Sequence, residues 1–318
     1  MALCNLPNRR YFFCEGVKSM LGIHAISEIS VKEIERLLDL ADEYKAGKGT
    51  RKNLNGKTVA LFFSENSTRT KMSFTLAAQK LGANVLDLNE DTSSINKGES
   101  LIDTAKTLEA MGADCLVIRH KESGITRYLQ KHINIPIINA GDGWSQHPSQ
   151  CLLDLMTIRE YKSSFTNLNV LIAGDILHSR VARSDAEALR KLGATVSFAG
   201  PKTLMPPETK TTLWPECLKD TDVLILLRLQ KERQEQGLLS SLNEYHNLYG
   251  LTEENLELLP KDSLILHPGP VNRGVELADS VLENPRSKIH EQVKNGVFAR
   301  MAMLYTAVEG RKIVEISA

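Results

Sequence analysis

Three short segments of the chain share one pattern, in which Leu or Met is followed by Gly-Ala, one polar residue and one apolar residue. The copies begin at Leu81, Met111 and Leu192. Glycine adopts the left-handed conformation that ends many helices without steric cost, so each copy predicts a helix end and a turn into a strand. Helices and strands that alternate through such joints predict parallel sheets covered by helices on both faces.

The hydrophobic pattern extends this alternation along the whole chain. The expected strands are 58–63, 85–88, 114–118, 135–139, 168–173, 195–199, 222–227 and 263–266. The expected helices are 31–44 (opened by a Ser30–Glu33 capping box), 68–81, 99–111, 123–132, 148–161, 181–192, 252–259 and 285–309. We therefore expect an α/β protein of two doubly wound domains, each a parallel sheet with helices on both faces. The expected boundaries are 1–147 plus 296–318 for the first domain and 148–295 for the second.

Composition excludes several classes of protein. The 318 residues include 39 basic and 39 acidic side chains, so the formal net charge is zero. This balance argues against a dedicated nucleic-acid binder and against a polybasic membrane-surface protein. No run reaches about 18 apolar residues, so we expect no membrane span. The five cysteines are scattered and form no C-x-x-C pair, which indicates a reducing, cytoplasmic location and no metal site.

The start of the expected helix 68–81 is rich in groups that bind anions. Ser67, Thr68, Arg69 and Thr70 directly follow a buried strand, where ligands of open α/β sheets bind. Free backbone N–H groups and the helix dipole favour an anion there, and a guanidinium suits phosphate. A capped helix with a surface arginine is the plain alternative, but the complete set favours an anion site.

Polar residues also follow the other expected strands. They are Arg119, His147, Gln150, Arg180, Arg228, Gln230, Pro268 and Gly269. Singly, each has a structural explanation as a surface charge, a capping residue or a stiff turn. Together they are donors and cations with one histidine and no evident nucleophile–base pair. Such a set suits the binding of two anions and the stabilisation of charge between them.

The polar segment 89–100 has two interpretations. It contains Ser93 and Lys97, and is either a solvated loop or a lid that delivers a lysine to an anion. No G-x-G-x-x-G fingerprint follows a first strand, and no G-x-x-x-x-G-K-[ST], H-E-x-x-H or G-x-S-x-G motif is present. The missing glycine fingerprint argues against a nicotinamide-dependent dehydrogenase.

Four motifs together resemble one known family. They are Ser67-Thr68-Arg69-Thr70 with Phe74, Arg119-His120, His147-Pro148-Ser149-Gln150 and His267-Pro268. In this order they resemble the aspartate and ornithine carbamoyltransferases, over about residues 10 to 310. The resemblance implies transfer of the carbamoyl group of carbamoyl phosphate to an amine, without a cofactor. Ornithine members carry a cysteine in the turn at 267–270, which is absent here, so L-aspartate is the implied acceptor and pyrimidine biosynthesis the implied pathway.

The resemblance also implies a role for each residue. The catalytic groups would be Arg69, Thr70, Arg119 and His147, which stabilise the oxyanion during direct attack without a covalent intermediate. The binding groups for carbamoyl phosphate would be Ser67, Thr68, Arg69, Thr70, Arg119, His147, Gln150, Pro268 and Gly269. Those for aspartate would be Lys97, Arg180, Arg228 and Gln230. Ser93 and Lys97 would come from the neighbouring subunit of a homotrimer with shared active sites.

Some positions depart from the family pattern, and some alternatives stay open. Lys71, Thr75 and Gly269 replace the usual residues, and Leu177-His178 replaces a Lys-Tyr pair of members controlled by a second chain. A larger assembly with regulatory chains or a dihydroorotase is left open. The alternatives in function are a carbamoyltransferase acting on another amine, a non-catalytic anion-binding protein of the same fold, and the dehydrogenase.

Overall fold

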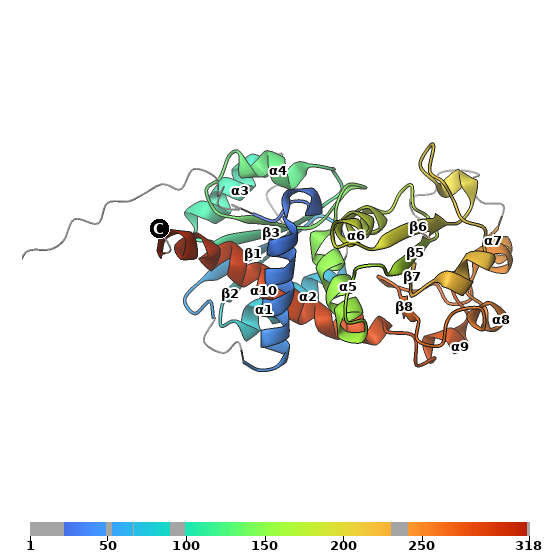
Figure 1. Ribbon diagram of the computed structural model, residues 1–318. Helices are drawn as coiled ribbons and strands as arrows, with labels where there is room; N and C mark the ends of the chain where they lie inside the picture. The colour runs from blue at the N-terminus through green and yellow to red at the C-terminus, as the bar shows by residue number, and fades with distance from the viewer. Residues whose placement is uncertain (1–21, 49–52, 66, 90–98, 230–240, 317–318) are drawn as a thin grey trace, which may run out of the picture.

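A computed structural model describes residues 22–48, 53–65, 67–89, 99–229 and 241–316 of the chain (Figure 1). The described residues form two lobes, each built on a parallel four-stranded sheet. The strand orders are β2-β1-β3-β4 and β6-β5-β7-β8. In both orders the chain starts inside the sheet, moves to one edge and then crosses to the other side, as in doubly wound folds. The expected fold class is confirmed.

The first sheet contains β1 (Thr58–Phe63), β2 (Asn84–Asn89), β3 (Cys115–His120) and β4 (Ile137–Asp142). Helices α1 (Val31–Lys45), α2 (Thr68–Lys80), α3 (Leu101–Ala110) and α4 (Ile125–Gln130) cover its two faces. Alternate side chains of β1 pack on opposite faces of the sheet. Leu61 belongs to the same core as α1 and α2, whereas Phe62 belongs to the core beneath α3 and α4. Burial on both faces explains why β1 is a continuous apolar run.

The second sheet contains β5 (Asn169–Ala173), β6 (Thr195–Ala199), β7 (Val223–Leu226) and β8 (Leu264–Leu266). Its helices are α6 (Arg180–Lys191), α7 (Leu242–Tyr249), α8 (Glu253–Leu256) and α9 (Asp279–Leu282). The described residues also form three short 3-10 turns, η1 (Ile26–Glu28), η4 (Lys202–Leu204) and η5 (Glu216–Asp220). Ile172 joins the core that includes α6, and Leu171 joins the core beneath α8 and α9.

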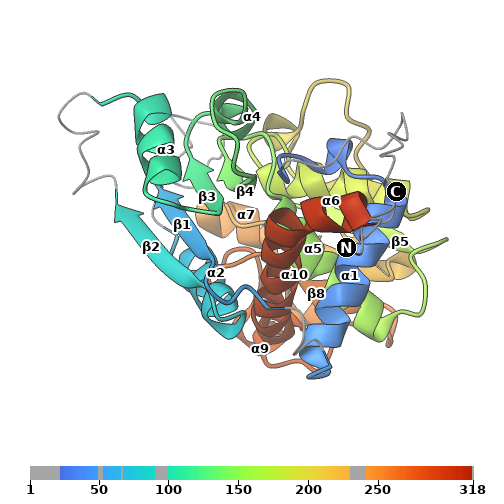
Figure 2. The same ribbon diagram turned by 90° about the vertical axis from the view of Figure 1, so that its left-hand side faces the viewer.

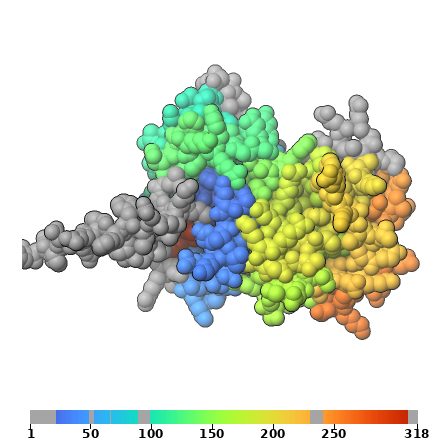
Figure 3. All heavy atoms as spheres, turned by 45° about the horizontal axis from the view of Figure 1, so that its top comes forward, coloured from blue at the N-terminus to red at the C-terminus, as the bar shows by residue number. Residues whose placement is uncertain are grey.

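Two helices connect the lobes. α5 (Pro148–Tyr161) lies between them and is buried from Pro148 to Ile158, and α10 (Ile289–Ile316) packs against α1, α2 and α5 (Figure 2). The lobes also meet where Lys191 of α6 donates to the carbonyls of Ile26, Ser27 and Ile29 at 2.7–3.1 Å. In Figure 3 the blue N-terminal segment borders the yellow residues of the second lobe there. The expected domain boundaries stay a prediction.

Local signals predicted several elements well. Ser30 and Glu33 form the expected capping box. The three recurrent glycines have positive φ values of 77° at Gly82, 90° at Gly112 and 89° at Gly193, so each joint is confirmed. None of the helices among the described residues is long and apolar enough to cross a membrane.

Some predicted boundaries were wrong. The last helix begins at Ile289 rather than Pro285, because the chain before it runs beside β8. The Arg286 carbonyl accepts a hydrogen bond from the Ile265 N–H, and the Lys288 N–H donates to the Ile265 carbonyl, both at 2.9 Å. β4 was expected at 135–139 but spans 137–142, since Pro136 has no N–H for the ladder. β3 continues through His120, so Arg119 lies inside a strand and not after it. Helix α7 was not predicted from the sequence.

Candidate active site

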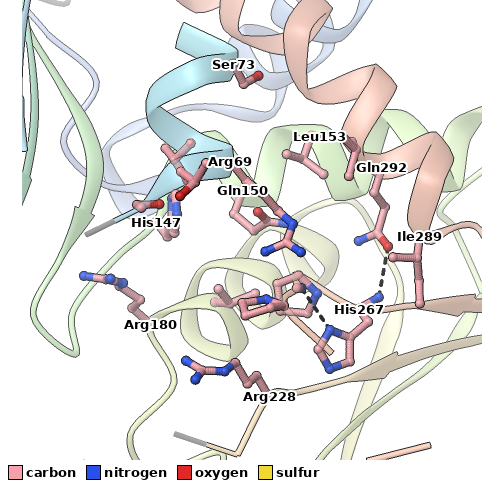
Figure 4. A pocket seen from close by; sticks show the side chains of 18 of the residues that line it. Arg69, Ser73, His147, Gln150, Leu153, Arg180, Arg228, His267, Ile289 and Gln292 are labelled. Atoms are coloured by element: carbon pink, nitrogen blue, oxygen red, sulfur yellow. Dashed lines mark hydrogen bonds between the residues drawn. The ribbon is translucent and has the colours of Figure 1, made fainter. Parts of the chain in front are cut away.

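A cavity of about 690 Å³ lies where the carboxyl ends of the two sheets face each other (Figure 4). It brings together the predicted site residues that the structure describes. These are Ser67, Thr68, Arg69, Thr70, Arg119, His147, Gln150, Arg180, Arg228, Pro268 and Gly269. The remaining three, Ser93, Lys97 and Gln230, lie outside the described residues.

The start of α2 forms one wall of the cavity. Ser67 is the N-cap residue, but its side chain makes no capping hydrogen bond, so the first N–H groups of α2 are not capped by this hydroxyl. Arg69 passes close to the turn after β8, where a methyl group added at Gly269 would lie 3.3 Å from Arg69 Nε. Gly269 also has φ of +63°, which disfavours any side chain. The local backbone geometry at this position therefore suits glycine.

Two arginines from different lobes meet at one carboxylate. Arg180 Nη2 donates to Glu65 Oε2 at 2.7 Å, and Arg119 Nε lies 3.4 Å from the same oxygen. Gly141, with φ of +115°, lies against both guanidinium groups, and a methyl group there would come within 3.1–3.3 Å of them. The carboxylate and the bare glycine together allow two cations to sit side by side at the cavity wall.

His147 is a neutral group in this cationic site. It is the N-cap residue of α5 and is buried, with Nε2 3.5 Å from Arg119 Nη1 and Nδ1 3.3 Å from Ser149 Oγ. Burial, followed by the charges of Arg119, Arg180 and Arg300, lowers its pKa well below the ordinary value of 6.5. The imidazole is therefore a hydrogen-bonding group, and its charge does not oppose the nearby arginines.

The turn after β8 is also organised by a neutral histidine. His267 Nδ1 accepts a hydrogen bond from the Gly269 N–H at 2.9 Å, so this nitrogen carries no proton. Burial, together with the charges of Arg69 and Arg228, lowers the pKa of His267 to about 3. The turn therefore presents Pro268 and Gly269 to the cavity in a fixed conformation.

Sequence reasoning missed the contribution of α10. Gln292 and Arg300 line the cavity, and Arg300 donates to Ser73 Oγ at 3.1 Å and to the Gly296 carbonyl at 3.0 Å. Burial lowers the pKa of Arg300 to about 10, so it stays charged. A spacing of four residues places Gln292, Gly296 and Arg300 on one helix face. This spacing of a glutamine and an arginine on one helix face was the available signal.

The fold and the site together define a class of protein. Ligands of open parallel sheets bind at the carboxyl ends of the strands, and here arginines of both lobes converge there with hydroxyls and a neutral histidine. Such a site belongs to an α/β enzyme that holds anionic substrates between two lobes.

Family models identify the chain more closely. The carbamoyl-P binding domain of aspartate/ornithine carbamoyltransferase matches residues 22–160, and the Asp/Orn binding domain matches residues 166–307. The chain therefore belongs to the aspartate/ornithine carbamoyltransferase family and is a transferase, which confirms the resemblance found in the sequence.

Relatives within the family favour one branch. The aspartate carbamoyltransferase catalytic subunit of Acetivibrio thermocellus is 50% identical over 298 residues, covering 91% of this chain and 95% of that protein. The corresponding subunit of Caldanaerobacter subterraneus is 47% identical, covering 92% and 99%.

Solved structures agree on the fold. Aspartate transcarbamoylase from Trypanosoma cruzi, in complex with carbamoyl phosphate and aspartate, has a TM-score of 0.80 and 29% identity, covering 90% of this chain and 96% of that one. Ornithine carbamoyltransferase from Pyrococcus furiosus also has a TM-score of 0.80, with 28% identity and coverage of 92% and 99%. The fold alone therefore does not separate the two acceptors.

Proposed function

We propose that this protein transfers the carbamoyl group of carbamoyl phosphate to the α-amine of L-aspartate, forming N-carbamoyl-L-aspartate and phosphate. The observation that carries the proposal is the convergence of Arg69, Arg119, Arg180 and Arg228 from both lobes on one cavity. The two substrates together carry several negative charges, which these cations match. The similarity to aspartate carbamoyltransferase catalytic subunits supports the same assignment.

Carbamoyl phosphate binds in the first lobe. The first turn of α2 faces the phosphate with backbone N–H groups and with Ser67, Thr68 and Thr70, while Arg69 supplies a charged fork. Arg119 reaches from β3 toward both the phosphate and the carbonyl oxygen. Gln150, Pro268 and Gly269 face the carbamoyl amino group.

Chemistry proceeds by direct attack. The neutral amine of aspartate forms a C–N bond with the carbamoyl carbon, the C–O bond to phosphate breaks, and the departing phosphate takes the amine proton. Arg69, Thr70, Arg119 and His147 stabilise the oxyanion. Alignment of the two substrates supplies ~7–11 kcal/mol of the barrier, so neither a covalent intermediate nor a dedicated base is needed.

His147 needs one particular tautomer for this role. A neutral imidazole carries one N–H, and only a proton on Nε2 lets it donate to the carbonyl oxygen beside Arg119. Ser149 Oγ lies 3.3 Å from Nδ1 and would then donate its hydroxyl proton to that nitrogen. A protonated Nε2 cannot accept a hydrogen bond from Arg119 Nη1, 3.5 Å away, and so donates to the ligand instead.

The acceptor site is in the second lobe. Arg180 and Arg228 suit the two carboxylates of aspartate, and Gln230 completes this group in our proposal. The ammonium of an ornithine side chain would instead meet these cations at close range, which is unfavourable. The charge of the acceptor site thus favours aspartate over ornithine, although the fold accommodates either.

Phosphate release with each acceptor tests the proposal. We expect release with carbamoyl phosphate and L-aspartate, with N-carbamoyl-L-aspartate as the second product. Formation of citrulline from ornithine in its place would assign the chain to the other branch. Binding of both substrates without any phosphate release would favour a non-catalytic anion-binding protein.

We further propose that the protein is a homotrimer in which Ser93 and Lys97 enter the active site of the neighbouring subunit. We also propose that it acts in the cytoplasm, at the committed step of de novo pyrimidine biosynthesis. The described cysteines, Cys115, Cys151 and Cys217, are free, which agrees with a reducing compartment. Inactive Lys97→Ala and Arg69→Ala chains should regain partial activity when assembled together. Mixed trimers without activity would contradict shared sites. A further assembly with regulatory chains or a dihydroorotase stays a prediction.

A further inference from the structure

A buried carboxylate lies directly behind the cavity wall. Asp154 of α5 is 1% exposed and accepts hydrogen bonds from two glutamines that line the cavity. Gln150 Nε2 lies 3.1 and 3.2 Å from its two oxygens, and Gln292 Nε2 lies 2.6 Å from Oδ1. One side chain therefore holds a glutamine of α5 and another of α10.

Gln292 extends this contact to the turn after β8. Its Oε1 accepts a hydrogen bond from the His267 N–H at 2.9 Å, shown as a dashed line in Figure 4. With Nε2 on Asp154 and Oε1 on His267, the amide has only one consistent orientation. Asp154 thus supports, through Gln292, the turn that carries Pro268 and Gly269.

Hydrogen bonds to Asp154 also fix the orientation of the Gln150 amide. Its NH2 group is turned toward the Asp154 carboxylate, which leaves Oε1 as the end available to a ligand. A flipped amide would set its oxygen against the carboxylate and lose a charge-assisted hydrogen bond. The cavity therefore presents a hydrogen-bond acceptor here, which suits an amino group on the ligand.

A second carboxyl group supports Asp154 from α6. Asp185 is 1% exposed and lies close enough to Asp154 for the two carboxyl groups to interact, yet neither of its oxygens has a hydrogen-bond partner among the described residues. Two carboxyl groups buried side by side repel each other unless one of them holds a proton. Burial raises the pKa of Asp154 to about 6, and burial together with the charge of Asp154 raises that of Asp185 well above its ordinary value.

The surrounding groups favour a proton on Asp185. The charge of Arg300, on α10, and the hydrogen bonds of Gln150 and Gln292 lower the pKa of Asp154 and so favour its ionised form. Asp185 has beside it the thiol of Cys151, whose own pKa is raised well above the ordinary value by burial. These influences favour Asp154 as the charged partner and Asp185 as the carboxyl group that holds the proton.

We propose that Asp154, through its hydrogen bonds with Gln150 and Gln292, is a positioning residue that presents Gln150 and the 267–269 turn as acceptors for the carbamoyl amino group. These contacts thereby set a preference for carbamoyl phosphate over acyl phosphates that lack an amino group. This inference rests on the proposed function, because it assigns the ligand whose amino group is recognised.

The test compares carbamoyl phosphate with acetyl phosphate, in which a methyl group replaces the amino group. In Asp154→Asn we expect the KM for carbamoyl phosphate to rise about 10- to 100-fold, since the charged anchor of two acceptors is lost. The inhibition constant of acetyl phosphate should change by less than about twofold, because a methyl group makes no such hydrogen bond. Equal weakening of both ligands would show that Asp154 is merely structural and would overturn the proposal.

Two further variants keep the test decisive if Asp154→Asn folds poorly. Gln292→Met cuts only the link to the turn, and should weaken carbamoyl phosphate several-fold, on the order of one lost hydrogen bond, without affecting acetyl phosphate. Asp185→Asn replaces the expected carboxyl proton by an amide N–H and should retain the wild-type preference. A preference lost in Asp185→Asn, or kept in Gln292→Met, would contradict the proposed chain of contacts.

Control and wild-type measurements separate the two proposals. Asp114→Asn makes the same chemical change in the first lobe, at a carboxylate bonded to Lys57 and the Thr58 N–H, and should leave the ligand preference unchanged. If the wild-type protein releases no phosphate with aspartate, the proposed function fails. The preference is then measured calorimetrically from the binding of each acyl phosphate alone, where equal affinities would overturn the inference independently.

Discussion

The two sides of the cavity are built differently. In the first lobe, Thr70 lies in the first turn of α2 and Arg119 lies within β3, so regular elements set their positions. In the second lobe, Arg180 opens α6, whereas Arg228 follows the end of β7, just before residues outside the described part. Elements that are held by their own hydrogen-bond ladders position side chains more firmly than the ends of loops do.

The lobes also differ in how their cations are held before a ligand binds. Arg180 is 5% exposed and forms an ion pair with Glu65 of the first lobe, so an acceptor carboxylate that reaches Arg180 competes with an internal carboxylate. The start of α2 instead offers backbone and hydroxyl donors that accompany Arg69. Substitutions in the first lobe should therefore mainly lower kcat, and those in the second should mainly raise the KM for the acceptor.

Arg69→Ala should have the largest effect. Loss of a charged donor at the developing oxyanion and phosphate is expected to lower kcat by about 10³-fold. Arg69→Lys keeps the charge but not the planar fork, and should recover only part of this loss. Steady-state kinetics with both substrates saturating measures the effect. A variant with normal kcat and a raised KM alone would remove the distinction between the two lobes.

Arg228→Ala should act mainly on acceptor binding. Removal of one partner of a desolvated charge pair is expected to raise the KM for aspartate about 30- to 100-fold. The KM for carbamoyl phosphate, measured at saturating aspartate, should change far less and serves as the internal control. A comparable rise in both constants would indicate that Arg228 serves both substrates.

Asp185→Asn, a substitution between the two lobes, should change how the free energy of unfolding depends on pH. Burial and the charge of Asp154 raise the pKa of Asp185 in the folded protein, whereas the unfolded chain releases this proton near pH 4, so we expect the wild type to lose stability relative to Asp185→Asn as pH rises above this value. The limiting slope is about 1.4 kcal/mol per pH unit, and the difference becomes constant above the folded pKa. Urea unfolding of both proteins at about pH 5 and pH 7 measures it. Parallel stability curves would show that no such proton is held.

Local rules explain why so much of the site was predictable. Ser67, Arg69 and Thr70 follow a buried strand in one short segment, and Gly82, Gly112 and Gly193 mark helix ends, so sequence neighbours carry the signal. The contacts of Asp154 with Gln292 and of Arg180 with Glu65 join residues more than a hundred positions apart. Such contacts depend on how the lobes pack, and no local pattern predicts them. The start of α10 was misplaced for the same reason, since its preceding segment pairs with β8.

Ser149→Ala should have the smallest effect, and it tests how the first-lobe site is tuned. Because the pKa of His147 lies far below 6.5, the imidazole stays neutral and the position of its single proton decides whether Nε2 donates to the carbamoyl oxygen. Loss of the Ser149 hydroxyl removes the group that favours a proton on Nε2. One neutral hydrogen bond corresponds to about a three- to tenfold loss in kcat, with both KM values nearly unchanged. Ser149→Thr retains the hydroxyl and should restore kcat. A larger loss in Ser149→Ala, shared by Ser149→Thr, would indicate that packing at the start of α5, and not the tautomer, limits the reaction.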